Sequence, residues 1–432
     1  MPLPSSIGPS AEAVASRYRE VRETTLALAR PLSEADAQVQ SMPDASPTKW
    51  HLAHTTWFFE TFVLEAHERG FRPFRPAYRV LFNSYYHGVG EQHARPRRGL
   101  VTRPGLAEVI DYRRDVDERV QALLARGVDA DAAALLTLGL NHEQQHQELI
   151  LTDALHVLSC NPLQPAYRDA PPAPSAGALP LQWVPLEGGL VEIGHDGAGF
   201  AFDNEQPRHR CWLDPYLLAS RLVTQSEWAA FVADGGYREP RWWLAAGWDW
   251  VRAQGVEAPM HWHRAGGGEW QVFTLAGPRA LEPHRPVVHV SLFEADADAR
   301  WFGARIGRTC RLPTEAEWEH AAAGCGDEIG RGNFLDDACW QAQPARPGRG
   351  ALAQLFGDAW EWTSSAYAAY PGYRPWPGAA GEYNAKFMVN QYVLRGGSFA
   401  TPRSHIRPSY RNFFPAETRW QFTGVRLASD AN

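Results

Sequence analysis

The chain has 432 residues, which is more than a single hydrophobic core usually contains. This length indicates at least two domains. Hydrophobic residues make up 44% and charged residues 21%, so the composition is that of a globular protein and not of a disordered one. The formal net charge of -7 predicts no basic surface that could follow a phosphate backbone, and nucleic acid is therefore not an expected partner.

The cysteines and the apolar runs bear on the compartment. Five cysteines are present, an odd number without any C-x-x-C pair, which does not match a disulfide framework or a zinc ribbon. The first residues lack the basic and apolar regions of a secretory signal, and no run of 18 apolar residues predicts a membrane span. We expect a cytoplasmic protein that does not enter a membrane.

The first 160 residues have the hydrophobic periodicity of helices, interrupted by a turn-rich stretch over residues 70–104. Ser46 and Pro47 predict a helix start, with Ser46 as the N-cap and Pro47 in the first helical position. Helices of these lengths favour an antiparallel four-helix bundle. The predicted helices cover residues 11–30, 47–69, 105–126 and 130–158.

Residues 163–181 are rich in proline and alanine and predict an interdomain linker. The linker divides a helical domain over residues 1–162 from a second domain over residues 182–432. The second domain mixes short β-like runs with short helices and long loops, so the predicted fold class is α+β with two domains. The β-like runs cover residues 190–194, 287–291 and 392–395, and the helices cover residues 224–233, 292–302 and 314–323.

Two histidines at positions i and i+4 predict a metal site. His142 and His146 would lie on one face of a helix, one turn apart, and could bind the same ion through neutral imidazoles. At least one further ligand is needed to complete such a site. From the spacing alone the candidates are His54 and His51, both on the predicted second helix, because bundles build metal sites from facing helices.

The same segment also matches the H-E-x-x-H pattern of zinc proteases, in which Glu143 would be the general base. The extended form of that pattern fails, because Leu149 stands at its glycine position and Thr152 at its third histidine position. The protease is therefore the weaker alternative.

Several long segments together resemble a known family. Residues 40–60 (QSMPDASPTKWHLAHTTWFFE), 82–86 (FNSYY) and 141–148 (NHEQQHQE) resemble the ergothioneine sulfoxide synthases, the EgtB family. Residues 311–319 (RLPTEAEWE), 356–363 (FGDAWEWT) and 395–398 (RGGS) resemble the formylglycine-generating-enzyme fold, a C-type-lectin-like domain. The resemblance covers nearly the whole chain.

The resemblance implies a DinB-like four-helix bundle followed by a formylglycine-generating-enzyme-like domain. It implies one non-haem Fe(II) ion held by three histidines, which fall on His54, His142 and His146, with His54 chosen over His51. O2 is the implied co-substrate. The implied reaction joins C2 of the imidazole of hercynine (trimethylhistidine) to a sulfur donor and oxidises the sulfur to a sulfoxide.

The resemblance also assigns roles at the site. Tyr85 and Tyr86 match active-site tyrosines, of which one need be catalytic, because a phenol can deliver a proton or an electron to the bound oxygen. Arg forks suit the carboxylate of the donor, and aromatic faces suit a trimethylammonium group. The implied donor-binding residues are Arg95 and Arg98, whereas Arg97 is expected at the surface; the implied hercynine-binding residues are Gln145, Asn412, Phe413 and Phe414.

Departures from the family pattern bear on the donor. Phe414 stands where the γ-glutamylcysteine-using branch has an acidic residue, which favours a smaller donor such as cysteine. Phe399 stands where the pattern has a small residue or a cysteine, and this counts against formylglycine-generating activity, which needs a cysteine pair for copper. Asp358, Ala359 and His87 also depart from the pattern, and they leave open the related selenoneine synthases (SenA), which join a selenosugar to hercynine. A binding-only role is the third class of function, and we expect a monomer.

Overall fold

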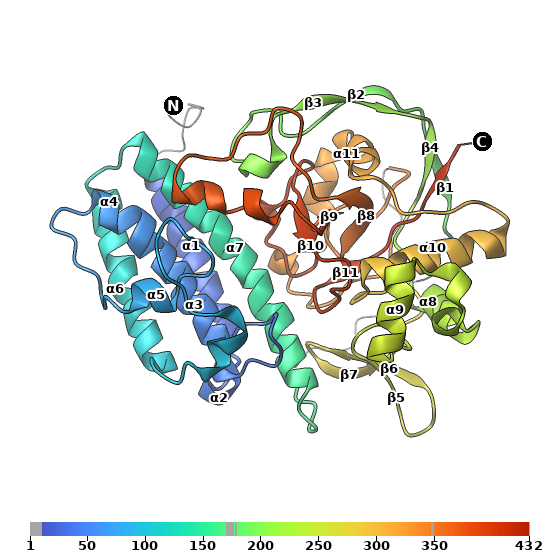
Figure 1. The fold of residues 1–432 in the computed structure, drawn as a ribbon, viewed down its shortest axis with the longest axis horizontal. Coiled ribbons are helices and arrows are strands. Elements are labelled where there is room, and N and C mark those ends of the chain that lie inside the picture. The colour runs from blue at the N-terminus through green and yellow to red at the C-terminus, as the bar shows by residue number, and fades with distance from the viewer. Residues whose placement is uncertain (1–10, 170–176, 178, 347–349, 432) are drawn as a thin grey trace. The chain divides into compact units, whose positions relative to one another are not determined.

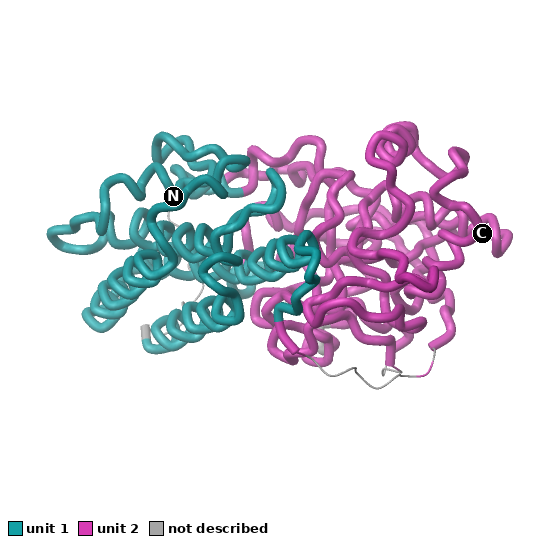
Figure 2. Tube along the Cα trace, turned by 90° about the horizontal axis from the view of Figure 1, so that it is seen from below, with its two compact units in different colours: residues 1–167, 197–200, 376–383 teal, residues 168–196, 201–375, 384–432 magenta. Residues whose placement is uncertain are grey.

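The computed structural model describes residues 11–169, 177, 179–346 and 350–431, and it divides into two compact units (Figure 2). The first unit comprises Met1–Tyr167 with two later segments, Gly197–Phe200 and Trp376–Tyr383. The second comprises Arg168–Asp196, Ala201–Pro375 and Asn384–Asn432. Part of the predicted linker over residues 163–181 lies outside the described residues.

Long helices form the first unit, where α1 packs on α7 and α3 packs on both α6 and α7 (Figure 1). Their apolar faces are buried, as in α6, where Val109, Val116 and Val120 are each 0% exposed. The long helices are α1 (Ala11–Ala29), α3 (Thr48–Phe58), α6 (Leu106–Ala125) and α7 (Ala130–Ser159). Shorter ones are α2 (Glu34–Gln38), α4 (Glu65–His67) and α5 (Tyr78–Leu81), with a π-helical segment over Phe59–Leu64 and a 3-10 segment over Arg95–Leu100.

The predicted start of the second long helix is wrong by one residue. Pro47, not Ser46, is the N-cap of α3, and no side chain caps that end. The reason is that Ser46 is engaged elsewhere: its backbone N–H donates to Asp153 Oδ2 at 2.8 Å, and its hydroxyl accepts from Arg98 Nη1 at 2.8 Å. The other three predicted helices agree with α1, α6 and α7 to within two residues at each end.

A buried cluster of charges holds α7 against α1 and α6. Glu143 on α7 is 0% exposed, and its carboxylate accepts from Arg22 Nη1 of α1 at 2.8 Å and from Arg113 of α6. Arg22 also pairs with Asp117 at 2.6 Å. Burial alone would raise the pKa of Glu143, but Arg113 and Arg22 outweigh it and lower that pKa to about 2.

The second unit has the mixed architecture expected from the sequence. Three of its helices begin with a capping box, in which Thr224, Ser291 and Thr314 each pair with a glutamate three residues on. Those helices are α8 (Gln225–Ala233), α10 (Leu292–Ile306) and α11 (Glu315–Ala323), and α9 (Ala245–Gln254) was not predicted.

Its strands form small sheets, ordered β1-β4-β12, β10-β9-β8-β11, β2-β3 and β5-β6-β7. The pairs are antiparallel except β11 with β8, which is parallel. The strands are β1 (Trp183–Leu186), β2 (Gly189–Ile193), β3 (His209–Leu213), β4 (Tyr216–Ala219), β5 (Trp262–Arg264), β6 (Trp270–Thr274), β7 (Gly277–Ala280), β8 (Trp360–Ala366), β9 (Tyr392–Arg395), β10 (Asn412–Phe414), β11 (Thr423–Gly424) and β12 (Ala428–Asp430).

One predicted strand does not form. The run over residues 287–291 was expected to be β, but it is irregular, because His289 has a φ of +65°, which breaks the extended conformation. Its backbone bonds go singly to three other segments: Val287 N donates to Val223 O, Val290 N donates to Thr423 O, and His289 O accepts from Met260 N. The runs at β2 and β9 do form strands.

None of the helices in the described part of the chain combines the length and apolar character that crossing a bilayer requires.

We expect Glu143→Gln to lower the free energy of unfolding by about 3 kcal/mol at neutral pH, because it leaves Arg113 buried beside a neutral amide. The pKa of Glu143 is about 2 in the folded chain and 4.5 as its ordinary value, so the carboxylate stabilises the fold above pH 4.5 and loses this effect as the pH falls towards 2. Urea unfolding followed by the helical circular dichroism at several pH values measures the difference.

The matched control is Glu65→Gln, because Glu65 pairs with Arg79 at the surface, where both side chains are more than 40% exposed. That change should cost less than about 1 kcal/mol. A loss of stability in Glu143→Gln that is the same at pH 3 and pH 7 would contradict the assignment of its effect to the carboxylate charge.

Candidate metal centre

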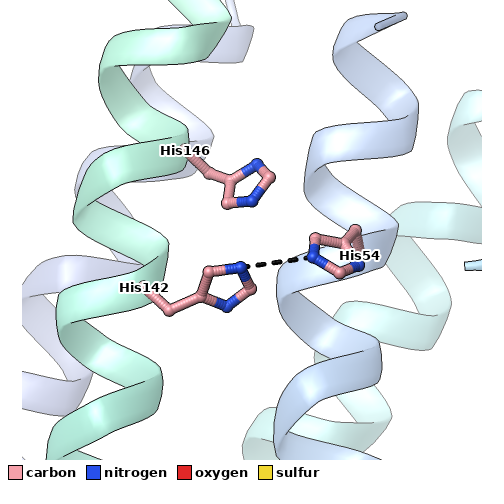
Figure 3. Close-up of side chains that lie close together, drawn as sticks. All are labelled: His54, His142 and His146. Atoms are coloured by element: carbon pink, nitrogen blue, oxygen red, sulfur yellow. Dashed lines mark hydrogen bonds between the residues drawn. The ribbon is translucent and has the colours of Figure 1, made fainter. Parts of the chain in front are cut away.

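Three buried histidines of the first unit converge between α3 and α7 (Figure 3). His54 comes from α3, and His142 and His146 come from successive turns of α7. One ring nitrogen of each lies within 4.8 Å of the others, and the residues are 0%, 1% and 8% exposed. The sequence spacing that suggested a shared ion is therefore matched by the side-chain geometry.

The orientation of His54 suits a metal ligand. Its Nδ1 donates to the backbone carbonyl of Phe82 at 2.7 Å, which leaves the lone pair on Nε2. That Nε2 lies 3.2 Å from Nε2 of His142. Two imidazole nitrogens bound at right angles to one ion, each about 2.1 Å from it, would be about 3.0 Å apart. The donor set thus fits a small divalent metal ion.

His51, the competing candidate ligand, lies behind the site. Its Nδ1 is 2.8 Å from Nδ1 of His146, and its Nε2 is 3.0 Å from Oδ2 of Asp153. Both of its nitrogens are therefore occupied by protein partners. Since Nδ1 of His146 faces His51, Nε2 of His146 is the nitrogen that remains for an ion.

The surroundings keep the imidazoles neutral, which is the form that binds a metal. Burial lowers the pKa of His142 to about 3 and also lowers the pKa values of His54 and His146. Neighbouring histidines lower the latter two further. The ring of His54 stacks with Trp50, at a centroid distance of 4.6 Å, and with Trp57, at 5.5 Å.

Glu143 does not point into this site. Its carboxylate belongs to the buried charge cluster with Arg22 and Arg113, on the side of α7 that faces α1 and α6. A zinc protease needs that carboxylate beside the metal-bound water. The geometry therefore gives no support to the protease alternative.

The loop after α5 carries the two predicted tyrosines and is shaped by Asn83. The Asn83 side chain accepts from the backbone N–H of Tyr86 at 3.0 Å and donates to the carbonyls of Tyr86 and Gly90. Tyr86 is 0% exposed and its ring lies 5.2 Å from that of Phe62, whereas Tyr85 is half-buried and stacks on Tyr86 at 4.7 Å. Burial raises the pKa of both phenols, so both stay protonated at neutral pH.

The sequence reasoning missed Tyr383, which lies in the later segment of the first unit. Its hydroxyl donates to Oε1 of Gln145, the residue between the metal histidines, and its ring meets that of His142 edge-on at 5.5 Å. Glu382 fixes this segment to the tyrosine loop, because its carboxylate accepts from the backbone N–H of His87 at 2.9 Å and of Gly88 at 2.6 Å. Tyr383 is 238 positions from Gln145, and no spacing rule connects them.

The two predicted donor-binding arginines differ in their surroundings. Arg98 is 4% exposed, lies 3.3 Å from the ring centroid of Trp50, and donates to Ser46 Oγ. No carboxylate of the described residues lies within ion-pair distance of it. Burial, followed by the charge of Arg95, lowers the pKa of Arg98. Arg95 is exposed and donates to the backbone carbonyl of Asp44, and Arg97 is exposed as predicted.

The three predicted hercynine-binding residues of the C-terminal half form β10 in the second unit. Phe413 stacks on Tyr367 with ring centroids 4.0 Å apart, and Phe414 meets Trp420 edge-on at 5.6 Å. The side-chain oxygen of Asn412 accepts from the backbone N–H of Phe413. All three are half-buried, and their roles towards hercynine stay predictions.

Comparison with known proteins agrees with both units. Residues 17–157 match the DinB superfamily, and residues 170–345 and 341–431 match the Sulfatase-modifying factor enzyme 1-like domain. A formylglycine-generating enzyme of Streptomyces coelicolor is 30% identical over a region that covers 61% of this chain and 96% of that protein.

Two further relatives match along nearly the whole length. A hercynine oxygenase of Mycolicibacterium thermoresistibile is 33% identical, with 97% of this chain and 95% of the relative covered. One of Mycobacterium tuberculosis is 32% identical, with 98% and 99% covered. Because this likeness runs through both units, the chain belongs to the hercynine oxygenase family, the ergothioneine sulfoxide synthases that its motifs resemble.

Proposed function

We propose that this protein is an Fe(II)- and O2-dependent enzyme that joins a thiol, cysteine in the first place, to C2 of the imidazole of hercynine and oxidises the sulfur to a sulfoxide. The observation that carries the proposal is the buried group of three neutral histidines in a chain related to hercynine oxygenases over its whole length. Hydrogen is lost from C2 and from the thiol, and one oxygen atom of O2 goes to sulfur and the other to water.

The three histidines His54, His142 and His146 would hold the iron. Because all three ligands are uncharged, the bound ion would keep its full positive charge, which would attract anionic partners such as a thiolate. Iron(II) bound there would supply O2 activation and open coordination positions. The walls of Trp50 and Trp57 around His54 exclude water from one side of the site.

Arg98 is the better of the two candidates for the donor carboxylate. A guanidinium that is buried without an acidic partner is costly, and a carboxylate from the substrate would compensate for that cost with a charge-assisted, bidentate contact. Its stacking on Trp50 fixes the plane of the fork beside the ring that also stacks on His54. Arg95, at the surface, would contribute a longer-range attraction.

For hercynine we assign the imidazole to Gln145 and the trimethylammonium group to Phe413, with Asn412 as a hydrogen-bonding neighbour. A quaternary ammonium offers no N–H, so an aromatic face is its natural partner. Tyr383 holds the Gln145 side chain through its hydroxyl and would thereby set the amide orientation. Phe414 offers the donor no charged group, unlike the acidic residue of the γ-glutamylcysteine-using branch, and this supports a small thiol. A selenosugar is the alternative donor.

The first experiment reconstitutes the protein with Fe(II) without oxygen, adds hercynine, and then admits O2 with cysteine, γ-glutamylcysteine or a selenosugar in parallel. We expect one iron per chain, O2 uptake only when hercynine and cysteine are both present, and a sulfoxide product by mass spectrometry. His142→Ala and His146→Ala should lose iron and turnover, because three ligands are the minimum for the site.

His156→Ala is the matched control, since His156 lies on the same helix but bonds Ser41. Iron and turnover retained by His142→Ala and His146→Ala would contradict the site. A selenium product formed in preference to the sulfoxide would choose the alternative donor, and hercynine binding without O2 uptake would leave a binding protein only.

Arg98→Gln should raise the KM for cysteine about tenfold to a hundredfold, because it removes a charge-assisted contact worth about 1.5–3 kcal/mol. The KM for hercynine should stay close to that of the unchanged enzyme. Steady-state O2 uptake at varied cysteine and at varied hercynine separates the two constants. Arg97→Gln, at an exposed neighbouring arginine, is the control, and an equal effect of both substitutions would argue against a specific carboxylate site.

Tyr85→Phe should divert the reaction from sulfoxide towards simple oxidation of the thiol, with sulfoxide formation reduced by about 100-fold or more, the usual effect of losing a proton donor. Tyr86→Phe is its matched partner and should change the product ratio little, because Tyr86 is packed against Phe62 and Trp57. Quantifying sulfoxide and sulfinate in each variant tests this, and a diversion seen with Tyr86→Phe instead would reverse the assignment.

A further inference from the structure

The nitrogens of the three histidines that face away from the site are held in different ways. His54 Nδ1 donates directly to a backbone carbonyl, and His142 Nδ1 has no hydrogen-bond partner among the described residues. His146 Nδ1 contacts a second imidazole, His51, which in turn contacts the Asp153 carboxylate. All members of this Asp153–His51–His146 chain are buried, at 3%, 2% and 8% exposed.

The direction of the hydrogen bonds in this chain follows from the backbone. Asp153 Oδ2 receives the backbone N–H of Ser46 at 2.8 Å, and a backbone N–H can only donate, so this oxygen is an acceptor. His51 Nε2, at 3.0 Å from the same oxygen, must therefore carry its hydrogen. In a neutral imidazole one nitrogen donates and the other accepts, so His51 Nδ1 is an acceptor.

The same logic reaches the metal site. Because His51 Nδ1 accepts, the hydrogen between the two rings belongs to Nδ1 of His146. The lone pair of His146 is then on Nε2, the nitrogen that faces the other two histidines. If the carboxylate or His51 were removed, His146 could adopt the other tautomer, with its hydrogen on Nε2 where the ion has to bind.

We propose that Asp153 and His51 are positioning residues for the metal, which hold His146 in the tautomer and ring orientation that presents Nε2 to the ion. The inference rests on the proposed function only in requiring that a divalent metal binds the three histidines. His146 is thus oriented through two further residues, whereas His142, on the same helix, has no hydrogen-bond partner at Nδ1 among the described residues.

The test measures the affinity of the full-length protein for Co(II), by competition with a chelator, and the visible spectrum of the bound cobalt. Asp153→Asn keeps the shape of the side chain and removes the charge, and His51→Phe removes both ring nitrogens. Each should weaken cobalt binding by about 10–100-fold and shift the cobalt absorption bands. His51→Gln, which retains one donor and one acceptor, should restore part of the affinity lost in His51→Phe.

Gln147→Met is the matched control for loss of a buried polar group next to a ligand. Gln147 lies on α7 beside His146 but donates to Val21 O and Thr25 Oγ1, away from the metal. It should bind cobalt as tightly as the unchanged protein, with the same spectrum. Circular dichroism checks that each variant is folded. The isosteric Asp153→Asn and the hydrogen-bonding His51→Gln keep the test decisive where His51→Phe does not fold.

The outcomes separate this inference from the proposed function. If the unchanged protein binds cobalt and the Asp153 and His51 variants match it in affinity and spectrum, the positioning role is wrong while the metal site stands. If all variants, Gln147→Met included, weaken binding alike, the effect is one of stability and the positioning role is again wrong. If the unchanged protein binds neither Co(II) nor Fe(II), the proposed function fails and this inference fails with it.

Discussion

The rotation of α7 about its own axis is the constraint on which the candidate metal centre depends. Successive residues of a helix point about 100° apart, so His142 and Glu143 cannot face the same neighbour. Glu143 is fixed by Arg22 of α1 and Arg113 of α6. Because Glu143 fixes its own side of α7 against α1 and α6, His142 and His146 face α3, which carries His54. The buried charges of Glu143, Arg22 and Arg113 thus have a structural role, because they set the direction in which the histidines of α7 point.

This arrangement explains why an H-E-x-x-H pattern can have an entirely different meaning from that of the zinc proteases. The pattern fixes only that the two histidines share a face; it does not fix where the intervening glutamate points relative to a metal-bound water. Here two buried arginines compensate the glutamate charge, and the pKa of about 2 keeps it an anion in an ion cluster. The discriminating information lies in Arg22 and Arg113, which are 121 and 30 positions from Glu143 in the sequence. A local motif does not contain it.

The parts of the site that could be predicted from the sequence are those set by short-range geometry or by long matching segments. The i, i+4 histidines needed only the helical repeat, and the helices predicted to start at residues 224, 292 and 314 begin within one residue of the observed starts of α8, α10 and α11. The misjudged start of α3 has a non-local cause, because Ser46 is drawn from capping by Asp153 and Arg98. Tyr383 was missed for the same reason: its place beside Gln145 depends on Glu382 binding two backbone N–H groups of the tyrosine loop. The strand expected at residues 287–291 does not form because His289 has a left-handed backbone conformation, which the hydrophobic pattern of the sequence does not predict.

Ser46 connects two parts of the site that the motifs present as separate. Its backbone N–H donates to Asp153, the first residue of the hydrogen-bonded series Asp153–His51–His146. Its hydroxyl accepts from Arg98, the candidate residue for binding the donor carboxylate. Trp50 makes a second connection, since one face of its ring stacks on His54 and its ring is also covered by the Arg98 guanidinium. A donor carboxylate bound to Arg98 would therefore lie next to Ser46 and Trp50, the residues that contact the groups orienting His146 and His54. In the proposed reaction, the group that would bind the donor carboxylate and the groups that orient two of the candidate metal ligands therefore meet at the start of one helix, α3.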